Sequence, residues 1–451
     1  MSHVAIIGGG ASGILAAVHL VARDPAIRIT LLEPRPRLGG IAYGVTEPGH
    51  LLNLPSSQMS AFSGLPDHFT RWLARNAPDA ARRACAPRGL YARYLGDLLA
   101  PALARGQVTW LRLGAEDLRM HDGLCVLGLS DGTRLVASHT ILAVGHLAGR
   151  YEREGLDNPW DTALPAHADD PVVILGTGLS MADRALQLLA AGHRGQITAV
   201  SRHGLMPHHD GERRPLIFDR ADLPLGASVT FAMRWLRAQT AWHLRRGGDW
   251  RDVIDGLGDA INTWWQTTSD DSRRRFLRHA RRYWIIHRHR LPRQEAALLE
   301  MARRSGQLVV VKGRLDGITD IPGTDQSATG LRRARIRTPS GAFRLFDAAQ
   351  IIDCRGILRP LMDRGDGDAP VGIALLDRLL LGGIAELDSF EFGLRLGPRG
   401  HLPHHPQIYA MGALRSGSSI DATSIRNIRA QAEQIAAALV PAPDQCRQSL
   451  A

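Results

Sequence analysis

Cysteine is scarce in this chain, with four among 451 residues and no CxxC pair. So few scattered thiols argue against a disulfide-stapled scaffold, and without a CxxC pair they indicate neither a zinc knuckle nor a dithiol redox centre. Lysine is scarcer still, because Lys312 is the only one. From the cysteine pattern we expect a protein of a reducing compartment, the cytoplasm.

Long apolar runs are also missing. No run approaches the ~20 residues that a membrane-spanning helix needs. The apolar N-terminus, residues 4–22, has no basic segment before it and is interrupted by glycines, so it is not read as a signal peptide. The hydrophobic fraction of 44% and the charged fraction of 22% are typical of globular proteins. The composition predicts a soluble chain without a membrane partner, and the length of 451 residues predicts more than one domain.

The net charge of +11 is concentrated in one stretch. Residues 201–305 hold 20 arginines against 12 carboxylates. A basic face attracts polyanions, but nucleic-acid binding also needs stacking aromatics on the same exposed face. Because nearly every basic residue is arginine, the excess also fits a codon bias. We therefore expect no nucleic-acid partner.

A glycine-rich turn follows the first apolar strand, residues 4–7. Gly8 permits the tight turn, Gly10 lets the backbone approach a pyrophosphate, and Gly13 lets helix and strand pack closely. The helix that follows directs free N–H groups and partial positive charge at the phosphates. The next strand ends at Glu33, 20 residues after Gly13, where an acid accepts ribose hydroxyls. A dinucleotide site is predicted; an empty αβ unit would leave Glu33 unexplained.

Other segments resemble parts of two-dinucleotide flavoproteins. The pair Gly39-Gly40 resembles the glycine region that runs beside FAD, and residues 140–146 resemble the crossover strand of those proteins. In the tail, residues 350–356 resemble a second crossover strand and residues 407–412 the last flavin-contacting strand, with Ala413 in place of the usual Asp. The helix over 424–439 would direct its positive end at the flavin. The resemblance implies FAD contacts at Gly8, Gly10, Ser12, Gly13, Glu33, Gly40, Ala42, Tyr43, Ala143, Gly145, Gly412 and Ser424.

A second strand-turn-helix unit begins at residues 171–175. Its third glycine is replaced by Met181, which puts the closest helix packing in doubt. The strand over 196–200 ends without an acid and is followed by Arg202, which can bind the 2′-phosphate that a carboxylate would repel. NADPH is therefore favoured, although Arg202 can also be an ordinary surface arginine. The predicted NADPH contacts are Gly176, Gly178, Leu179, Ser180, Ser201 and Arg202.

Residues 207–304 interrupt the Rossmann pattern and predict a mainly helical insertion. The aromatic spacing there is helical, and we interpret the tryptophans mostly as core. His287 and His289 have no carboxylate or cysteine nearby in the sequence, and we interpret the pairs at 208–209 and 404–405 in the same way, so no metal site is predicted. Six of the nine tryptophans fall in the insertion: Trp235, Trp242, Trp250, Trp264, Trp265 and Trp284.

The chain resembles a bacterial family of FAD- and NAD(P)-binding proteins that is similar to the class B flavin monooxygenases. That family includes enzymes that N-hydroxylate L-aspartate in natural-product pathways. The resemblance implies that Asn53, Gln58, Met59 and Ser60 lie near the flavin ring, while no catalytic base can be named. The motifs that carry it are Ile6–Gly13, His50–Phe62, Ser201–Gly204, Trp284–Pro292 and Gly412–Gly417.

The predicted fold class is α/β, with two Rossmann-like domains for FAD and NADPH. The expected boundaries are 1–165 for the first part of the FAD domain, 166–345 for the NADPH domain with its insertion, and 346–451 for the C-terminal part of the FAD domain. We expect an NADPH- and FAD-dependent monooxygenase that uses molecular oxygen on a small amine or amino acid, with Arg288 and Arg290 as carboxylate clamps. A reductase without oxygen insertion and a flavin-containing binding or sensor protein are the alternatives. The oligomeric state stays open.

Overall fold

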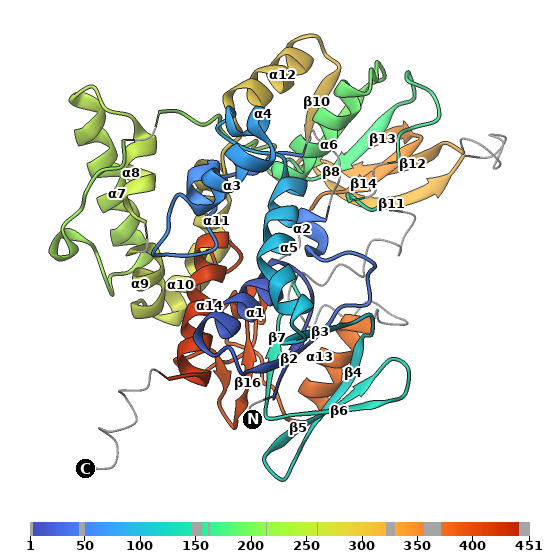
Figure 1. Cartoon of the computed structure of the whole chain (residues 1–451). Coiled ribbons are helices and arrows are strands. Elements are labelled where there is room, and N and C mark those ends of the chain that lie inside the picture. Colours follow the sequence, from blue (N-terminus) through green and yellow to red (C-terminus); the bar gives the residue numbers. More distant parts are fainter. Residues whose placement is uncertain are drawn as a thin grey trace. The chain divides into compact units, whose positions relative to one another are not determined.

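The computed structural model describes residues 3–44, 50–145, 156–160, 163–212, 214–258, 260–321, 330–355 and 371–441. The chain divides into two compact units (Figure 1). The first comprises residues 1–48, 54–149 and 358–451, and the second residues 49–53 and 150–357. The ends of two predicted motifs, His146 and Gly356, lie outside the described residues.

The first unit is built on a six-stranded sheet of order β15-β16-β7-β1-β2-β3, parallel except at β15. Its central strands are short, apolar and almost wholly buried, as a parallel sheet covered on both faces requires. Helices α1 and α14 pack against each other, and α1 also contacts α5. The elements are β1 (His3–Ile7), β2 (Arg28–Leu32), β3 (Val108–Leu111), β7 (His139–Leu142), β15 (His401–Leu402), β16 (His405–Ala410), α1 (Ala11–Arg23), α5 (Arg88–Ala104) and α14 (Ile425–Leu439).

A three-stranded antiparallel sheet precedes β7 in the chain. It consists of β4 (Ala115–His121), β5 (Leu124–Leu129) and β6 (Arg134–Ala137), and α13 (Val371–Leu381) packs against β4. Buried leucines of this small sheet and of α13 share one apolar cluster with the ends of the large sheet. The shorter helices of this unit are α2 (Gly40–Tyr43), α3 (His68–Asn76) and α4 (Pro78–Ala81).

The second unit repeats this plan. Its parallel sheet has the order β10-β9-β8-β14, which matches β3-β2-β1-β7 in the first unit strand for strand. A three-stranded antiparallel sheet, β11-β12-β13, again precedes the last parallel strand. The elements are β8 (Val172–Leu175), β9 (Ile197–Ser201), β10 (Leu308–Lys312), β11 (Arg314–Asp320), β12 (Arg332–Arg337), β13 (Phe343–Ala348), β14 (Gln350–Asp353), α6 (Leu179–Ala190) and α12 (Arg293–Arg304).

Strand β14 lies on the other side of the expected boundary at 345/346. Its residues pair in parallel register with β8, so that Ile352 is opposite Ile174. The sequence signature of a crossover strand is an apolar run that ends in a turn, and either parallel sheet can accept such a run. Only the hydrogen-bonded neighbour decides the assignment, and here that neighbour belongs to the second unit.

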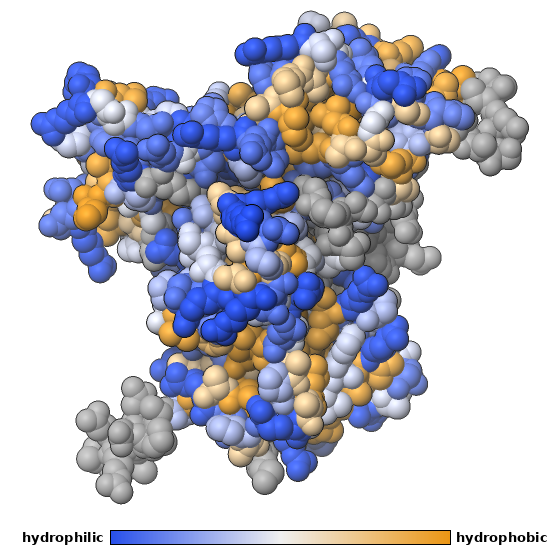
Figure 2. Space-filling view, turned by 45° about the horizontal axis from the view of Figure 1, so that its top comes forward, coloured by the Kyte–Doolittle hydropathy of each residue, from blue (hydrophilic) through white to orange (hydrophobic). Residues whose placement is uncertain are grey.

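The predicted insertion is helical where the structure describes it. Trp264, Trp265 and Trp284 are buried, as the core interpretation expected, whereas Trp242 on α7 is 40% exposed. Figure 2 shows one face of the whole chain, on which apolar areas lie among hydrophilic residues. None of the helices in the described parts of the chain combines the length and apolar character needed to cross a membrane. The insertion contains α7 (Val229–Arg245), α8 (Trp250–Gly256), α9 (Ala260–Thr267), α10 (Asp270–Arg275), a π-helical turn (Phe276–Ala280) and α11 (Arg281–Arg288).

The close packing at Gly13 gives a stability prediction. A Cβ at this position would lie 1.9 Å from the Gly8 carbonyl oxygen, so Gly13→Ala should lower the free energy of unfolding by about 1–3 kcal/mol. Gly96 is the matched control, since it lies inside α5 with open space where a Cβ would be; Gly96→Ala should raise that free energy by about 0.5–1 kcal/mol. Denaturant unfolding of both variants checks the opposite signs.

Candidate cofactor sites

The first glycine turn is held against the end of β7. Gly8 has a φ of +111°, and a Cβ there would lie 2.3 Å from the Ala143 carbonyl oxygen. The Gly8 N–H donates to the Leu32 carbonyl at 2.8 Å. Glycine is therefore required by both conformation and space. The structure brings Gly8 and Ala143 together, two residues that the sequence placed in the same site.

The beginning of α1 is open to an anion. Gly10 precedes the helix, and a Cβ there would meet only the Gly40 Cα, at 3.7 Å. No side chain caps the helix, and no acidic residue occupies its first turn. The first N–H groups of a helix have no intrahelical acceptor, so a pyrophosphate can accept hydrogen bonds from them.

Glu33 joins the end of β2 to the glycine turn. Its side chain is 6% exposed, and its Oε2 accepts from the Gly9 N–H at 2.9 Å. Oε1 accepts from the Arg35 N–H at 3.0 Å. A carboxylate has about four lone-pair sites, so acceptor capacity remains for ribose hydroxyls. Glu33 thus supports the turn in addition to the ribose role predicted for it.

The second glycine pair packs directly on the turn. The Gly39 N–H donates to the Gly9 carbonyl at 2.9 Å, and a Cβ on Gly40 would lie 2.9 Å from the Gly10 Cα. Gly40 begins α2, which also contains Ala42 and Tyr43. The Tyr43 ring lies 4.9 Å from that of Tyr91, and burial raises the pKa of Tyr43 to about 12. Tyr43 is therefore a neutral hydrogen-bonding group at physiological pH.

The C-terminal segment reaches the same turn through Gly412. This residue has a φ of +64°, its N–H donates to Gln431 Oε1 at 2.8 Å, and a Cβ there would lie 2.9 Å from Ser12 Oγ. Ser424 caps α14, because its Oγ accepts from the Asn427 N–H at 3.3 Å. The Ser424 hydroxyl can still donate one hydrogen bond. Gly145, with a φ of +67°, has open space where a Cβ would be.

The residues expected near the flavin ring differ in exposure and in whether their side chains already make hydrogen bonds. Ser60 is 1% exposed, and its hydroxyl donates to the Leu65 carbonyl at 2.6 Å and accepts from the Phe62 N–H at 3.1 Å. Ser60 therefore holds its own loop together. Met59 is buried, Gln58 is exposed, and Asn53 groups with the second unit.

Arg290 is not available as a clamp for a substrate. Its side chain is 1% exposed; Nε contacts Asp210 Oδ1 at 2.8 Å and Nη2 contacts Asp255 Oδ2 at 2.6 Å. Two carboxylates already compensate one guanidinium, and separating a buried pair of this kind is strongly destabilising. The sequence-based expectation for Arg290 is replaced by a structural role. Arg288 ends α11 and is partly exposed.

The second glycine turn repeats the geometry of the first. Gly176 has a φ of +114°, and a Cβ there would lie 2.2 Å from the Cys354 carbonyl oxygen at the end of β14. Gly178, where a Cβ would meet open space, precedes α6, whose start, Leu179 and Ser180, has no side-chain cap and no acid in the first turn. Met181 is fully buried in the apolar core, so the helix packs without a third glycine.

Cations gather where β9 ends. Ser201 uses its hydroxyl locally, at 2.9 Å from Thr177 Oγ1 and accepting from the Gly204 N–H. Arg202 is exposed and makes no hydrogen bond or ion pair with the residues that the structure describes. Arg282 Nη1 lies 3.2 Å from His203 Nε2, and Lys312 is opposite Ser201 in the sheet register.

The residues around His203 show that this cluster is positively charged. Burial lowers the pKa of His203, and four cations lower it further: Arg282, Arg202, Arg314 and Lys312. No carboxylate contributes to this shift. Sequence reasoning found Arg202 alone. The position of Lys312 at the carboxyl end of a parallel strand was a usable signal, whereas nothing in the sequence pairs residue 282 with residue 203.

Among the described residues, no group of three His, Cys, Asp or Glu side chains is arranged to hold a metal ion. Among these residues Cys85, Cys125 and Cys354 are buried and form no disulfide.

Residues 5–147 match the model of a family described as FAD-NAD(P)-binding. The chain is also similar to ornithine N-hydroxylase of Kutzneria sp. 744, solved with reduced FAD, NADP⁺ and L-ornithine, at 14% identity and a TM-score of 0.65 over 99% of this chain and 100% of that one. The FAD-bound cadaverine monooxygenase of Erwinia amylovora matches at 11% identity and a TM-score of 0.59, over 96% and 93%. Bacillithiol disulfide reductase of Staphylococcus aureus matches at 13% identity and a TM-score of 0.56, over 98% and 99%. No curated protein sequence matches the chain.

These likenesses establish the fold, which is that of the two-dinucleotide-binding flavoproteins. The family match shows in addition that the N-terminal part of the chain is a FAD-NAD(P)-binding domain. The α/β fold class predicted from the sequence is thereby confirmed.

The two hydrogen bonds of Glu33 give a prediction for the first site. Glu33→Gln turns one acceptor into a donor that faces a backbone N–H, so it should lower the free energy of unfolding by about 1–3 kcal/mol. It should also weaken retention of the cofactor. Glu391, which is exposed and whose side chain makes no hydrogen bond with the described residues, supplies the neutral control Glu391→Gln. Equal stability of the two variants would contradict the role of Glu33 in supporting the turn.

Proposed function

We propose that the first unit binds FAD and that the second unit binds NADPH. The residues present fit both groups: each unit has a turn that only glycine can form, and each turn precedes a helix whose first N–H groups are uncapped. The first turn is also flanked by Gly39-Gly40, Gly412 and Glu33. FAD, when bound, would accept a hydride from NADPH and pass electrons to oxygen or another acceptor. The chain's own contribution is to hold, orient and shield both groups.

The preference for NADPH over NADH follows from the two strand ends. In the first unit the strand ends at buried Glu33, which would repel a phosphate on the ribose. In the second unit the same position is followed by Arg202, with Arg282, Arg314 and Lys312 around His203. A 2′-phosphate would receive charge-assisted hydrogen bonds there without displacing a carboxylate.

The activity proposed for the chain is that of a flavin monooxygenase that N-hydroxylates a small amine or amino acid. The support is the whole-chain likeness to the ornithine and cadaverine enzymes, together with the two nucleotide turns. The resemblance of the sequence motifs adds L-aspartate to the candidate substrates. Gln58 and Met59, which belong to the first unit, are proposed to face the flavin ring, and partly exposed Arg288 is the candidate for a carboxylate contact.

A reductase that transfers electrons without inserting oxygen is the second candidate. The likeness to bacillithiol disulfide reductase favours it, because the same fold supports that chemistry. The absence of a CxxC pair disfavours a disulfide reductase that uses a dithiol of this chain. Only turnover experiments separate the two candidates.

The nicotinamide preference is tested with Arg202→Ala. Removing a charge-assisted contact should lower the ratio of kcat/KM for NADPH to that for NADH about 10- to 100-fold. Arg282→Ala should change the ratio in the same direction. Arg237→Ala is the matched control, since Arg237 is exposed on α7 and does not contribute to the His203 environment. An unchanged ratio in Arg202→Ala would refute the assignment.

Oxygen insertion is tested by turnover under ¹⁸O₂. The FAD-loaded protein with NADPH should convert at least one of L-aspartate, L-ornithine and cadaverine to a product that is one labelled oxygen heavier, measured by mass spectrometry. NADPH oxidation that yields only hydrogen peroxide with every amine, but proceeds anaerobically with a quinone, would decide for the reductase.

A further inference from the structure

His203 lies two residues beyond the end of β9, and its side chain is accessible to solvent. Its Nε2 lies 3.2 Å from Arg282 Nη1 on α11. A guanidinium nitrogen can only donate, so Nε2 is the acceptor of this hydrogen bond and the ring proton is on Nδ1. The geometry therefore assigns the neutral form to His203.

Cations from several elements surround this neutral imidazole. Arg202 precedes it in the chain, Arg282 comes from α11, Lys312 from β10 and Arg314 from β11. Partial burial lowers the pKa of His203, the four charges lower it further, and no carboxylate acts in the opposite direction. All of these residues belong to the second unit, so this unit alone forms the cluster.

A phosphate dianion at this strand end would reverse the balance of charge around His203. Arg202 and Arg282, the proposed contacts of the 2′-phosphate, are two of the cations that act on the imidazole, so the phosphate would enter the same cluster. An opposite charge within about 4–6 Å favours the charged form of a titratable group. A protonated imidazole has two donors and no acceptor, so His203 and Arg282 would both donate to the phosphate.

We propose that His203 is a specificity-determining residue, which takes up one proton when a 2′-phosphorylated nucleotide binds. The inference rests on the proposed NADPH site of the second unit. The proton comes from solvent and is held at Nε2, in place of the hydrogen bond from Arg282, and no covalent bond of the nucleotide changes. NADH and NAD⁺ carry a ribose hydroxyl where NADPH and NADP⁺ carry the phosphate, so they should bind without this proton.

The coupling gives the preference for the phosphorylated nucleotide a defined dependence on pH. As the pH rises above the range in which the bound form keeps its proton, the affinity for NADP⁺ should fall, by at most about tenfold per pH unit for one proton. Below about pH 6 the 2′-phosphate itself becomes protonated, and the affinity should fall there as well. The affinity for NAD⁺ should not follow either change.

The test counts protons by isothermal titration calorimetry of the full-length, FAD-loaded protein at about pH 7. Binding heats are compared in two buffers of different ionisation enthalpy, such as MOPS and Tris. The protein should take up about 0.5 proton or more per NADP⁺ and less than about 0.1 per NAD⁺. The 2′-phosphate by itself would release about 0.1 proton at this pH, so the sign identifies His203 rather than the phosphate as the titrating group.

The calorimetry also separates this inference from the proposed function. If NADP⁺ binds more tightly than NAD⁺ but without proton uptake, the role of His203 is overturned and the NADPH site stands. If the two nucleotides bind equally, the NADPH assignment fails, and the inference that rests on it fails as well.

Two variants show whether His203 is the group that takes up the proton. His203→Asn keeps a polar side chain without a titrating group, so it should abolish the uptake and lower the preference for NADP⁺ about 3- to 10-fold. His279→Asn is the matched control, because His279 is exposed on the π-helical turn and does not contribute to the His203 environment. The control should keep both the uptake and the preference. Proton uptake that persists in His203→Asn, with circular dichroism confirming the fold, would overturn the proposal.

Discussion

The contact between a strand-end carbonyl and the first glycine of each nucleotide turn is the constraint on which both sites depend. A Cβ on Gly8 would lie only 2.3 Å from the Ala143 carbonyl oxygen, and a Cβ on Gly176 only 2.2 Å from the Cys354 carbonyl oxygen. This approach places the start of α1 and of α6 at the carboxyl end of a central strand, which is where a parallel sheet leaves a crevice for a nucleotide. The same contact occurs twice because the two units repeat one strand order, β3-β2-β1-β7 and β10-β9-β8-β14.

Charge distinguishes the two turns, since their backbones are so similar. Buried Glu33 braces the first turn, whereas an exposed arginine and its cationic neighbours follow the equivalent strand in the second unit. An acid at one strand end and an arginine one residue beyond the equivalent position of the other suit one nucleotide with free ribose hydroxyls and another that carries an extra phosphate. In the proposed function this difference in charge would let each nucleotide occupy its own unit.

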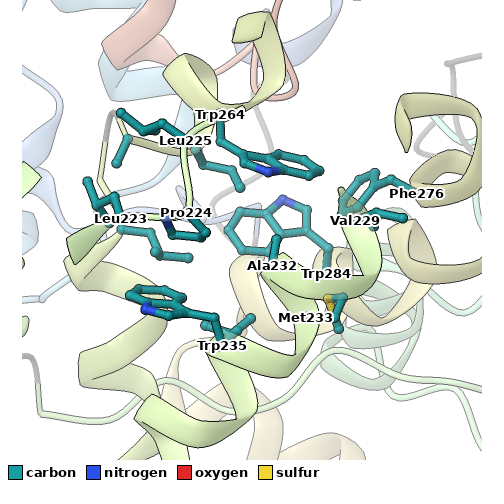
Figure 3. Close-up of a pocket in the computed structure, with 14 residues that line it drawn as sticks. Leu223, Pro224, Leu225, Val229, Ala232, Met233, Trp235, Trp264, Phe276 and Trp284 are labelled. Atoms are coloured by element: carbon teal, nitrogen blue, oxygen red, sulfur yellow. The ribbon is translucent and has the colours of Figure 1, made fainter. Parts of the chain in front are cut away.

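The arginines of the insertion have different structural roles. Arg290 is buried between two carboxylates and holds α8 and α11 to the preceding loop, while Arg282 approaches His203 at the end of β9. Trp235, Trp264 and Trp284 of the same insertion line an apolar pocket (Figure 3). Composition reports the total charge of such a segment, but the role of each residue depends on which partner lies beside it.

The sequence by itself determined the two αβ units, their glycine turns, the acid at the end of one strand, the arginine after the other and the helical nature of the insertion. These features are local: they depend on periodicity, on glycine conformation and on the spacing of residues along one strand-turn-helix segment. Only the tertiary structure decided that β14 pairs with β8, that Arg290 is consumed by Asp210 and Asp255, and that Arg282 joins Arg202. Strand neighbours and ion pairs form between segments far apart in the chain, so the same local pattern is compatible with several partners until the fold selects one.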